Sequence, residues 1–198
     1  MDGATDAEMI SGSLTDPRLF AAVYDRHAST VFRFLVRRVG RDTADELVGD
    51  VFRIAFERRA TFDCARPSAR PWLYGIATNL VAKHRRTEAR RLRATAQFAA
   101  EVATDSLADS VVGGVDAYQL WPSVAHGIAE LPDGERDALL LYAWEELTYE
   151  EVAAALEIPV GTVRSRLSRA RGRLRELTAP SGEQPLTAPT AQRTRIEP

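Results

Sequence analysis

Residues 148–177 constrain the fold of this chain most, because they encode two short helices joined by a tight turn. Thr148 and Glu151 have the spacing of a capping box, in which each side chain bonds the other residue's backbone N–H. A helix should therefore start at Thr148. Pro159 should end it near Glu157, because proline lacks the N–H that a helix interior needs and suits the first turn of a following helix. The stretch predicts a helix-turn-helix.

The second of these helices has one apolar face, formed by Val163, Leu167, Ala170 and Leu174 at helical spacing. Most other positions hold six arginines and one glutamate, namely Arg164, Arg166, Arg169, Arg171, Arg173, Arg175 and Glu176. Arginine suits a polyanion and can bind guanine edges bidentately, so we interpret the helix as a DNA reader. A solvated face and a basic surface that contacts protein or membrane are the alternatives, although solvated helices usually mix both charge signs.

Basic and acidic residues are strongly segregated along the chain, although the net charge is small. The chain has 198 residues, 45% hydrophobic and 27% charged, with a net charge of -2, which is ordinary for one large or two small globular domains. Basic residues gather in residues 83–93 and 164–175, and acidic ones in residues 1–16 and 105–116. Because local charge decides what a surface attracts, a nucleic-acid partner is compatible with the net value.

The residues that usually carry catalysis are sparse. The single Cys64 excludes an intramolecular disulfide and a multi-cysteine zinc site. His27, His84 and His126 have no metal-type spacing, so each is expected at the surface or satisfied in the core. We predict no catalytic residue, cofactor, metal or small-molecule substrate. Neither a signal peptide nor a long apolar run is visible, so a cytoplasmic protein without membrane contact is expected.

The first half predicts a helical domain over residues 16–93, after a polar and disordered arm over residues 1–15. Asp16 and Pro17 open a helix that Gly40 ends, with a break allowed at residues 29–30. Asp42 caps a second amphipathic helix, whose outer face is acidic; helix-dipole complementation and solubility explain that face most simply. Residues 61–70 form a loop, and the helix that follows from near Pro71 becomes basic in its later turns.

The second half begins after a linker over residues 94–115, which is rich in alanine, aspartate, serine and glycine. Residues 116–178 predict a second helical domain, and the proline-rich residues 179–198 a disordered tail. Trp72, Trp121 and Trp144 lie in apolar helical patterns and are expected to anchor the core. The fold class is therefore all-α, with two small helical domains joined by a flexible linker.

Both domains resemble the conserved regions of the extracytoplasmic-function (ECF) sigma factors, a group of the bacterial sigma-70 family. Residues 16–93 are similar to sigma region 2, through residues 45–52 and 72–80. Residues 116–178 are similar to region 4, through residues 148–153 and above all 161–171. The resemblance implies a cytoplasmic factor, nucleoid-associated through RNA polymerase, that binds core enzyme, recognises minus-35 and minus-10 promoter elements and assists melting.

The resemblance also assigns residues to partners. Docking on the clamp helices of the largest catalytic subunit falls to Asp45, Glu46, Leu47, Asp50 and Val51. Minus-10 recognition falls to Phe62, Asn79, Lys83, Arg85, Arg86 and Arg90. Minus-35 recognition falls to Arg136, Arg164, Ser165, Ser168, Arg169 and Arg171. The polymerase flap and an anti-sigma factor are further expected partners.

Two positions depart from the family pattern. Gly49 stands where the family usually has glutamine, and a glycine inside a helix costs about 1 kcal/mol relative to alanine. Lys83 replaces a common aspartate, which makes the minus-10 helix more basic. By analogy the linker follows the active-site and RNA-exit channels, where Asp105 and Asp109 mimic nucleic acid. The alternative function is a free-standing helix-turn-helix regulator with a dimerisation or sensing domain, which has no evident need for a second basic helix.

Overall fold

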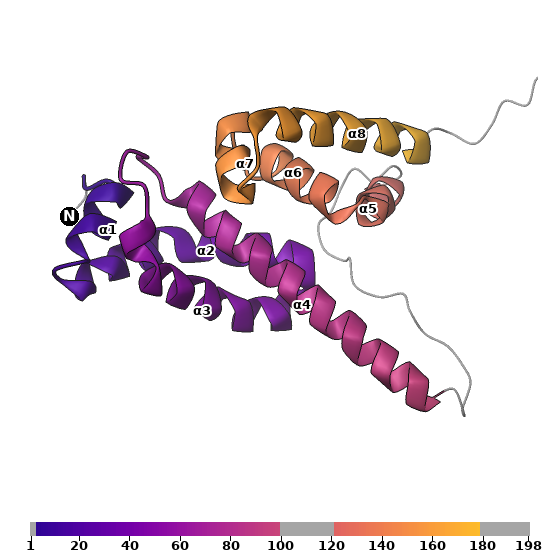
Figure 1. The fold of residues 1–198 in the computed structure, drawn as a ribbon, viewed down its shortest axis with the longest axis horizontal. Helices are drawn as coiled ribbons and strands as arrows, with labels where there is room; N and C mark the ends of the chain where they lie inside the picture. The colour runs from indigo at the N-terminus through magenta and orange to yellow at the C-terminus, as the bar shows by residue number, and fades with distance from the viewer. Residues whose placement is uncertain (1–2, 100–120, 179–198) are drawn as a thin grey trace, which may run out of the picture.

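The computed structural model describes residues 3–99 and 121–178 (Figure 1). The first half contains α1 (Asp6–Gly12), α2 (Phe20–Val39), α3 (Arg41–Glu57) and α4 (Arg70–Ala99), with 3-10 turns η1 (Pro17–Leu19) and η2 (Arg59–Thr61). The second half contains α5 (Trp121–Glu130), α6 (Asp133–Ala143), α7 (Tyr149–Leu156) and α8 (Val160–Thr178). No strand occurs in these ranges, which confirms the all-α class. The tail, Asp105 and Asp109 lie outside the described residues.

Helices α2, α3 and α4 pack side by side and bury their apolar faces against one another. Gly40 ends α2 with a φ of 79°, a left-handed conformation that suits glycine, as the sequence predicted. Two local expectations were wrong. Helix α2 continues through Ser29 and Thr30 without a break, and α3 begins at Arg41, so that Asp42 lies in its first turn and does not cap it.

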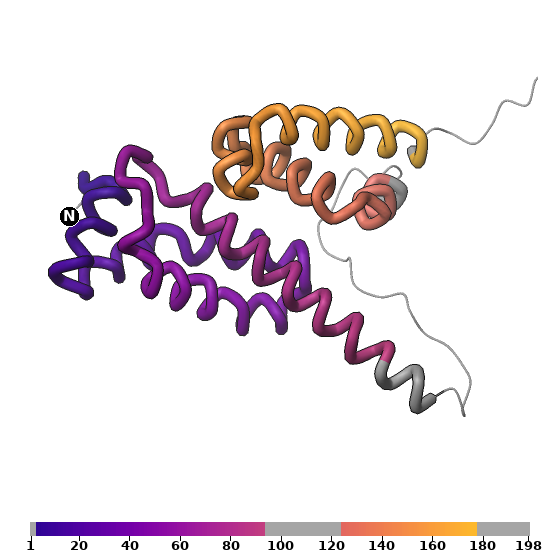
Figure 2. Tube along the Cα trace, viewed as in Figure 1, coloured from indigo at the N-terminus to yellow at the C-terminus, as the bar shows by residue number. Residues whose placement is uncertain are grey.

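The N-terminal arm is ordered over α1, so the prediction of a disordered segment over residues 1–15 was wrong there. Thr5 and Glu8 form a capping box, with Glu8 Oε2 2.7 Å from the Thr5 backbone nitrogen. Met9 and Ile10 are buried, and α1 contacts α2 and η2 (Figure 2). A short helix with two buried apolar side chains is enough to fix this segment, because the rest of the domain supplies the surface that covers them.

Helix α4 extends beyond the expected start of the linker. Residues 94–99, which composition assigned to the linker, continue α4 as far as Ala99. They contain neither proline nor glycine, and alanine is the strongest helix former, so nothing in the sequence ends the helix at Arg93. The composition change at this point marks a change of charge and not the end of the helix.

Helices α7 and α8 form the predicted helix-turn-helix. Thr148 caps α7 with the full capping box, and its hydroxyl oxygen lies 3.2 Å from the Glu151 nitrogen. Glu157 has a left-handed backbone, with a φ of 53°, and ends α7. The Thr162 N–H donates to the Pro159 carbonyl at 2.8 Å and thereby starts α8. Among the described helices, none combines the length and the hydrophobicity needed to cross a bilayer.

The two helical domains are packed on each other, whereas the sequence suggested independent units on a flexible linker. Helix α7 crosses α4 so closely that a Cβ added at Gly75 would lie 2.5 Å from the Ala155 carbonyl oxygen (Figure 1). Glu145 sits at the centre of the interface and accepts a hydrogen bond from the Tyr74 hydroxyl. Arg70 donates to the Glu145 carbonyl at 2.9 Å. We call this arrangement the closed form.

Candidate nucleic-acid interface

Helix α8 presents a cationic face to solvent. Val163, Leu167 and Ala170 are buried, so the opposite side of the helix is exposed. Arg164, Ser168 and Arg171 follow one another there at i, i+4 and i+7, and Ser165 and Arg169 lie beside them; all five are exposed. The structure thus brings together every predicted minus-35 residue that belongs to α8.

Some arginines of α8 are also tied to α6. Arg169 Nε lies 3.2 Å from Glu135 Oε1, and Arg173 Nε lies 3.1 Å from Glu135 Oε2. The Arg171 guanidinium stands 5.5 Å from the centre of the Tyr142 ring, a cation–π contact. Arg164 has no ion pair within the described ranges, so it is the arginine of this face that is most available for an external partner.

Arg136 does not lie on the α8 face. Its guanidinium donates to the carbonyl oxygens of Ile128, Ala129 and Leu131 at 3.1, 2.8 and 2.6 Å. Ile128 and Ala129 lie in the last turn of α5, whose carbonyls lack i+4 partners within the helix, and Leu131 directly follows it. The structure therefore shows that Arg136 caps the end of α5, and its predicted contact with the DNA backbone stays a prediction.

Helix α4 carries the second cationic face. Asn79, Lys83, Arg86 and Arg90 follow one another at i, i+4, i+7 and i+11, so they form one line along the helix, and it faces solvent over much of its length. Arg85 points elsewhere, since it donates to the Arg38 carbonyl at 3.1 Å and lies 3.5 Å from Asp133.

Phe62 is a core residue in this structure, and its assignment to the minus-10 element stays a prediction. It is buried, and its ring centre lies 5.2 Å from that of Trp72. The apolar ring at the end of η2 therefore holds the loop against α4 and is not presented to a base. The exposed part of this connection is residues 63–67.

The face of α4 is partly covered. Asn79 and Lys83 line a cavity of about 410 Å³, whose opposite wall is formed by Ala154, Ala155 and Glu157 of the helix-turn-helix. In the closed form α7 therefore stands beside the first half of the α4 face, where Asn79 and Lys83 are still exposed, whereas Arg86 and Arg90 lie beyond it.

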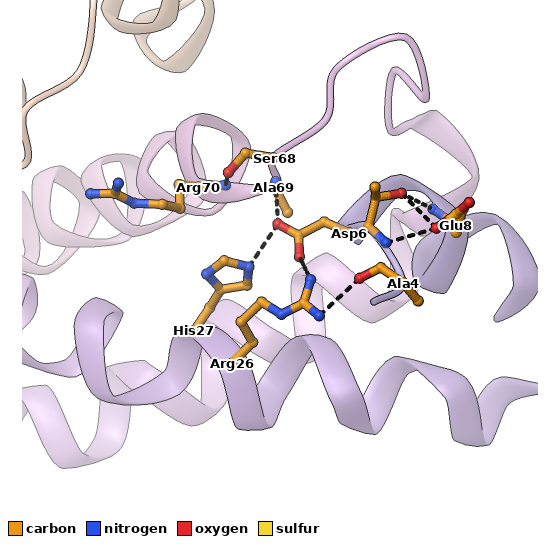
Figure 3. Close-up of polar contacts among 9 residues, drawn as sticks. Ala4, Asp6, Glu8, Arg26, His27, Ser68, Ala69 and Arg70 are labelled. Carbon is orange, nitrogen blue, oxygen red and sulfur yellow. Dashed lines mark hydrogen bonds and ion pairs between the residues drawn. The ribbon is translucent and has the colours of Figure 1, made fainter. Parts of the chain in front are cut away.

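A buried carboxylate fixes the loop before α4 (Figure 3). Asp6 Oδ2 accepts the backbone N–H of Ala69 at 2.7 Å and lies 2.7 Å from His27 Nε2, while Oδ1 accepts from Arg26 at 2.7 Å. Burial raises the pKa of Asp6, but the bonds from His27, Ala69 and Arg26 outweigh it and lower the pKa to about 2. The sequence interpretation missed Asp6; the Thr5 and Glu8 spacing was the available signal.

Helix α3 carries the acidic surface. Asp45 and Glu46 are exposed, and Asp50 is half-exposed and pairs with Arg53 at 3.0 Å. Leu47 and Val51 are buried in the core, and their assignment as polymerase contacts stays a prediction. Gly49 lies on the exposed side, where an added Cβ would meet no atom within 4 Å.

Known proteins match the chain in the same two blocks. The family model described as Sigma-70 region 2 matches residues 23–91, and that described as Sigma-70, region 4 matches residues 123–174. The ECF RNA polymerase sigma factor SigC of Mycobacterium tuberculosis is 34% identical over 173 residues, covering 87% of this chain and 90% of that protein. The ECF RNA polymerase sigma factor SigW of Bacillus subtilis is 30% identical over 168 residues, covering 81% and 89%.

Solved structures show the same fold. The sigma factor RpoE of Bartonella quintana, in complex with the anti-sigma factor NepR, has a TM-score of 0.59 at 25% identity, covering 80% of this chain and 95% of that chain. CnrH, in complex with the cytosolic domain of CnrY, has a TM-score of 0.60 at 24% identity, covering 87% and 96%. A free-standing helix-turn-helix regulator is not favoured, because the matches span both blocks. The chain belongs to the sigma-70 family, within the ECF group of RNA polymerase sigma factors.

Proposed function

We propose that this sigma factor binds core RNA polymerase and directs it to promoters, with α8 recognising a minus-35 element and α4 a minus-10 element. The observation that supports this best is the pair of separate cationic faces, on α8 and on α4, together with an acidic surface on α3. One basic helix would suffice for a simple operator-binding protein. Two cationic faces on different domains suit two promoter elements, of which one is bound as duplex DNA and the other as a single strand.

Helix α8 reads duplex DNA in the major groove. Arg164 and Ser168 lie in its first turns, where a recognition helix reaches base edges. A bidentate arginine–guanine pair contributes about 1–3 kcal/mol of discrimination. Arg169 and Arg171 bind phosphate, and Arg169 exchanges its ion pair with Glu135 for one with the DNA backbone.

Helix α4 holds the displaced strand of the minus-10 element. The line from Asn79 to Arg90 spans eleven residues, or about 16 Å of helix, and offers a cationic track for a single strand. The loop held by Asp6 precedes it and provides the surface for an unstacked base. Binding of such a base offsets an unstacking cost of a few kcal/mol, so melting proceeds through binding energy and without covalent chemistry.

Helix α3 docks the factor on the clamp helices of the largest catalytic subunit. Asp45 and Glu46 are exposed on one side of the helix and supply the charge. Leu47 and Val51 support this surface from the buried side, so their effect on docking is indirect. Electrostatic complementarity of this kind mainly raises the association rate and fixes the orientation.

Opening of the closed form favours binding of both promoter elements. Asn79 and Lys83 are exposed but share a cavity with α7, so a strand gains full access to the α4 face when α7 leaves it. A partner that favours the closed form would silence the factor. An anti-sigma factor is the expected partner of this kind, and the polymerase is the partner that favours the open form.

Run-off transcription with purified core polymerase tests the proposal. The chain should bind promoter duplex weakly alone and initiate specific transcripts once core enzyme is added. Replacement of Asp45 and Glu46 by alanine should weaken core binding and leave the fold intact, with Glu57→Ala on the same helix as a control, since Glu57 pairs only locally with Arg53. Tight operator binding without any effect on core enzyme would overturn the proposal.

A further inference from the structure

A cavity of about 230 Å³ lies where α2 and α4 face α5 and α6. Four arginines reach it: Arg37, Arg38, Arg85 and Arg136. Its apolar wall consists of Ala125, Ile128, Leu140 and Trp144. None of the residues that line it is acidic. The cavity is thus both cationic and apolar. The family resemblance assigns Arg85 and Arg136 to promoter DNA, whereas Arg37 and Arg38 have no assigned role.

Arg38 is the most informative of these residues. Its side chain is only 2% exposed, and it bonds Asp137 through Nη2. Its Nε and Nη1 atoms are buried and have no hydrogen-bond partner within the described part of the chain. Because these two atoms have almost no accessible surface, a ligand in the cavity does not reach them, and Arg38 contributes its positive charge to the cavity.

The surrounding charges also favour an anion. Burial, together with the nearby charges of Arg136 and Arg38, lowers the pKa of Arg85. Around the cavity, Asp133, Asp137 and Glu145 pair with arginines of this cluster. Three carboxylates face four guanidinium groups, which leaves an excess of positive charge. An acceptor with negative charge would relieve the mutual repulsion of the arginines.

The apolar wall indicates that the anion carries a compact apolar body. Trp144 and Leu140 offer carbon surface, and the Arg37 guanidinium lies 5.3 Å from the Trp144 ring centre. The arginine fork matches the oxygens of a phosphate group, which can accept from several guanidinium groups at once. We propose that this cavity is a binding site for a small phosphate monoester with an apolar or aromatic body.

The position of the site gives it a regulatory consequence. Arg38 and Arg85 belong to the first domain, whereas Arg136, Leu140 and Trp144 belong to the second, so the complete cavity exists only in the closed form. A ligand that binds one of two forms shifts the population toward it. Binding should therefore oppose core association, a step that rests on the proposed function, whereas the site itself does not.

Titration of the full chain with phenyl phosphate tests the site, by calorimetry and by NMR of the Trp144 indole. Phenol and inorganic phosphate serve as comparison probes, since each supplies only half of the ligand chemistry. Arg85→Gln should weaken phenyl phosphate binding about tenfold, which is the loss of one charge-assisted hydrogen bond. Arg33→Gln is the matched control, because Arg33 lies on α2 one turn before Arg37 and is exposed outside the cavity.

Ala125→Phe provides a second variant, which keeps all four arginines and fills the cavity with a ring. It should abolish binding, and its folded state can be checked by its circular dichroism and melting curve. Equal affinity of wild type and Ala125→Phe for phenyl phosphate would overturn the proposal, as would no binding by wild type. If inorganic phosphate binds as tightly as phenyl phosphate, the inference that the ligand carries an apolar body is overturned.

The regulatory step has a separate readout. Phenyl phosphate at saturating concentration should weaken binding of wild type to core polymerase and leave that of Ala125→Phe unchanged. If the ligand binds the isolated chain but core association does not change, the site stands and only the population shift is refuted. If the chain fails to bind core polymerase at all, the proposed function fails while the calorimetric result is untouched.

Discussion

Helices α4 and α8 both carry a line of cationic residues, but they differ in what covers them. From Arg164 to Arg171 the reading face of α8 is open to solvent, whereas Asn79 and Lys83 of α4 face α7 across a cavity. We therefore expect α8 to bind duplex DNA without rearrangement. On α4, Asn79 and Lys83 are exposed but stand beside α7, so we expect a melted strand to bind there more tightly when the domains separate.

Opening the domain interface by mutation should produce the largest effect. Gly75→Ala places a Cβ 2.5 Å from the Ala155 carbonyl oxygen, a clash with backbone that a side-chain rotation cannot relieve. We expect it to destabilise the closed form by about 3 kcal/mol, the upper end for overpacking. Small-angle X-ray scattering should show a larger radius of gyration, and affinity for single-stranded minus-10 DNA should rise.

The matched control is Gly49→Ala, the same change in a neighbouring helix where no atom lies within 4 Å of the new Cβ. Its radius of gyration should stay at the wild-type value. An unchanged radius for Gly75→Ala as well would mean that α7 does not restrain α4, and the contrast between the two cationic faces would lose its basis.

The reading face of α8 is tested by Arg164→Ala. Loss of one bidentate contact should reduce discrimination among minus-35 sequences by about 1–3 kcal/mol. Competition between promoter variants, measured with polymerase holoenzyme, reports this directly. Arg175→Ala, near the far end of the same helix, should weaken binding to all promoter sequences alike. We expect this exposed arginine to contact only the DNA backbone. Identical sequence selectivity of the two variants would count against α8 as the reader.

Helices α4 and α8 also differ in what holds their N-terminal ends. Low pH should loosen the start of α4 and leave that of α8 unchanged. The pKa of Asp6 is lowered to about 2 from 3.8, so its stabilisation is present above pH 4 and is lost as pH falls toward 2. The loss is about 2 kcal/mol of unfolding free energy. The start of α8 relies on the local Pro159 carbonyl and lacks this dependence.

Chemical denaturation of wild type and Asp6→Asn at pH 6 and pH 2.5 checks this prediction. The variant should be less stable at pH 6, and the difference should shrink toward zero at the lower pH. Hydrogen exchange of the Ala69 amide should accelerate over the same range. A difference that is constant with pH would show that the carboxylate charge of Asp6 does not hold the loop.

The smallest effect concerns Gly49 itself. Because its exposed position accepts a Cβ freely, Gly49→Ala should raise the stability of the chain by about 1 kcal/mol through helix propensity. Thermal unfolding measures the gain. No gain would indicate that the glycine conformation is not helical in solution, which would bear on the docking surface of α3.

Structural features that depend on residues close together in the sequence were predicted well. The capping box at Thr148, the stop at Gly40 and the apolar stripes of α3 and α8 follow from spacing alone. The same spacing bears on one assignment that the family resemblance made. Leu47 and Val51 fit the buried stripe of α3 by their period, so the helical pattern indicates the core for both, and only the family resemblance assigns them to the polymerase.

What the sequence could not predict depends on contacts between distant segments. The partners of Asp6 come from α2 and from the start of α4, and the partners of Glu145 come from α2 and α4 of the other domain. Arg136 reads as one more basic residue until its three carbonyl acceptors are seen. Such pairings have no period and leave no local signature.

The length of α4 has a mechanical consequence. Thirty residues of continuous helix make a rod about 45 Å long, whose first half is embedded in the bundle and whose second half projects from it (Figure 1). This rod fixes the position at which the next segment of the chain leaves the first domain. Under the proposed function, the second domain would move away while its attachment to the first domain stays fixed relative to the polymerase-docking surface of α3.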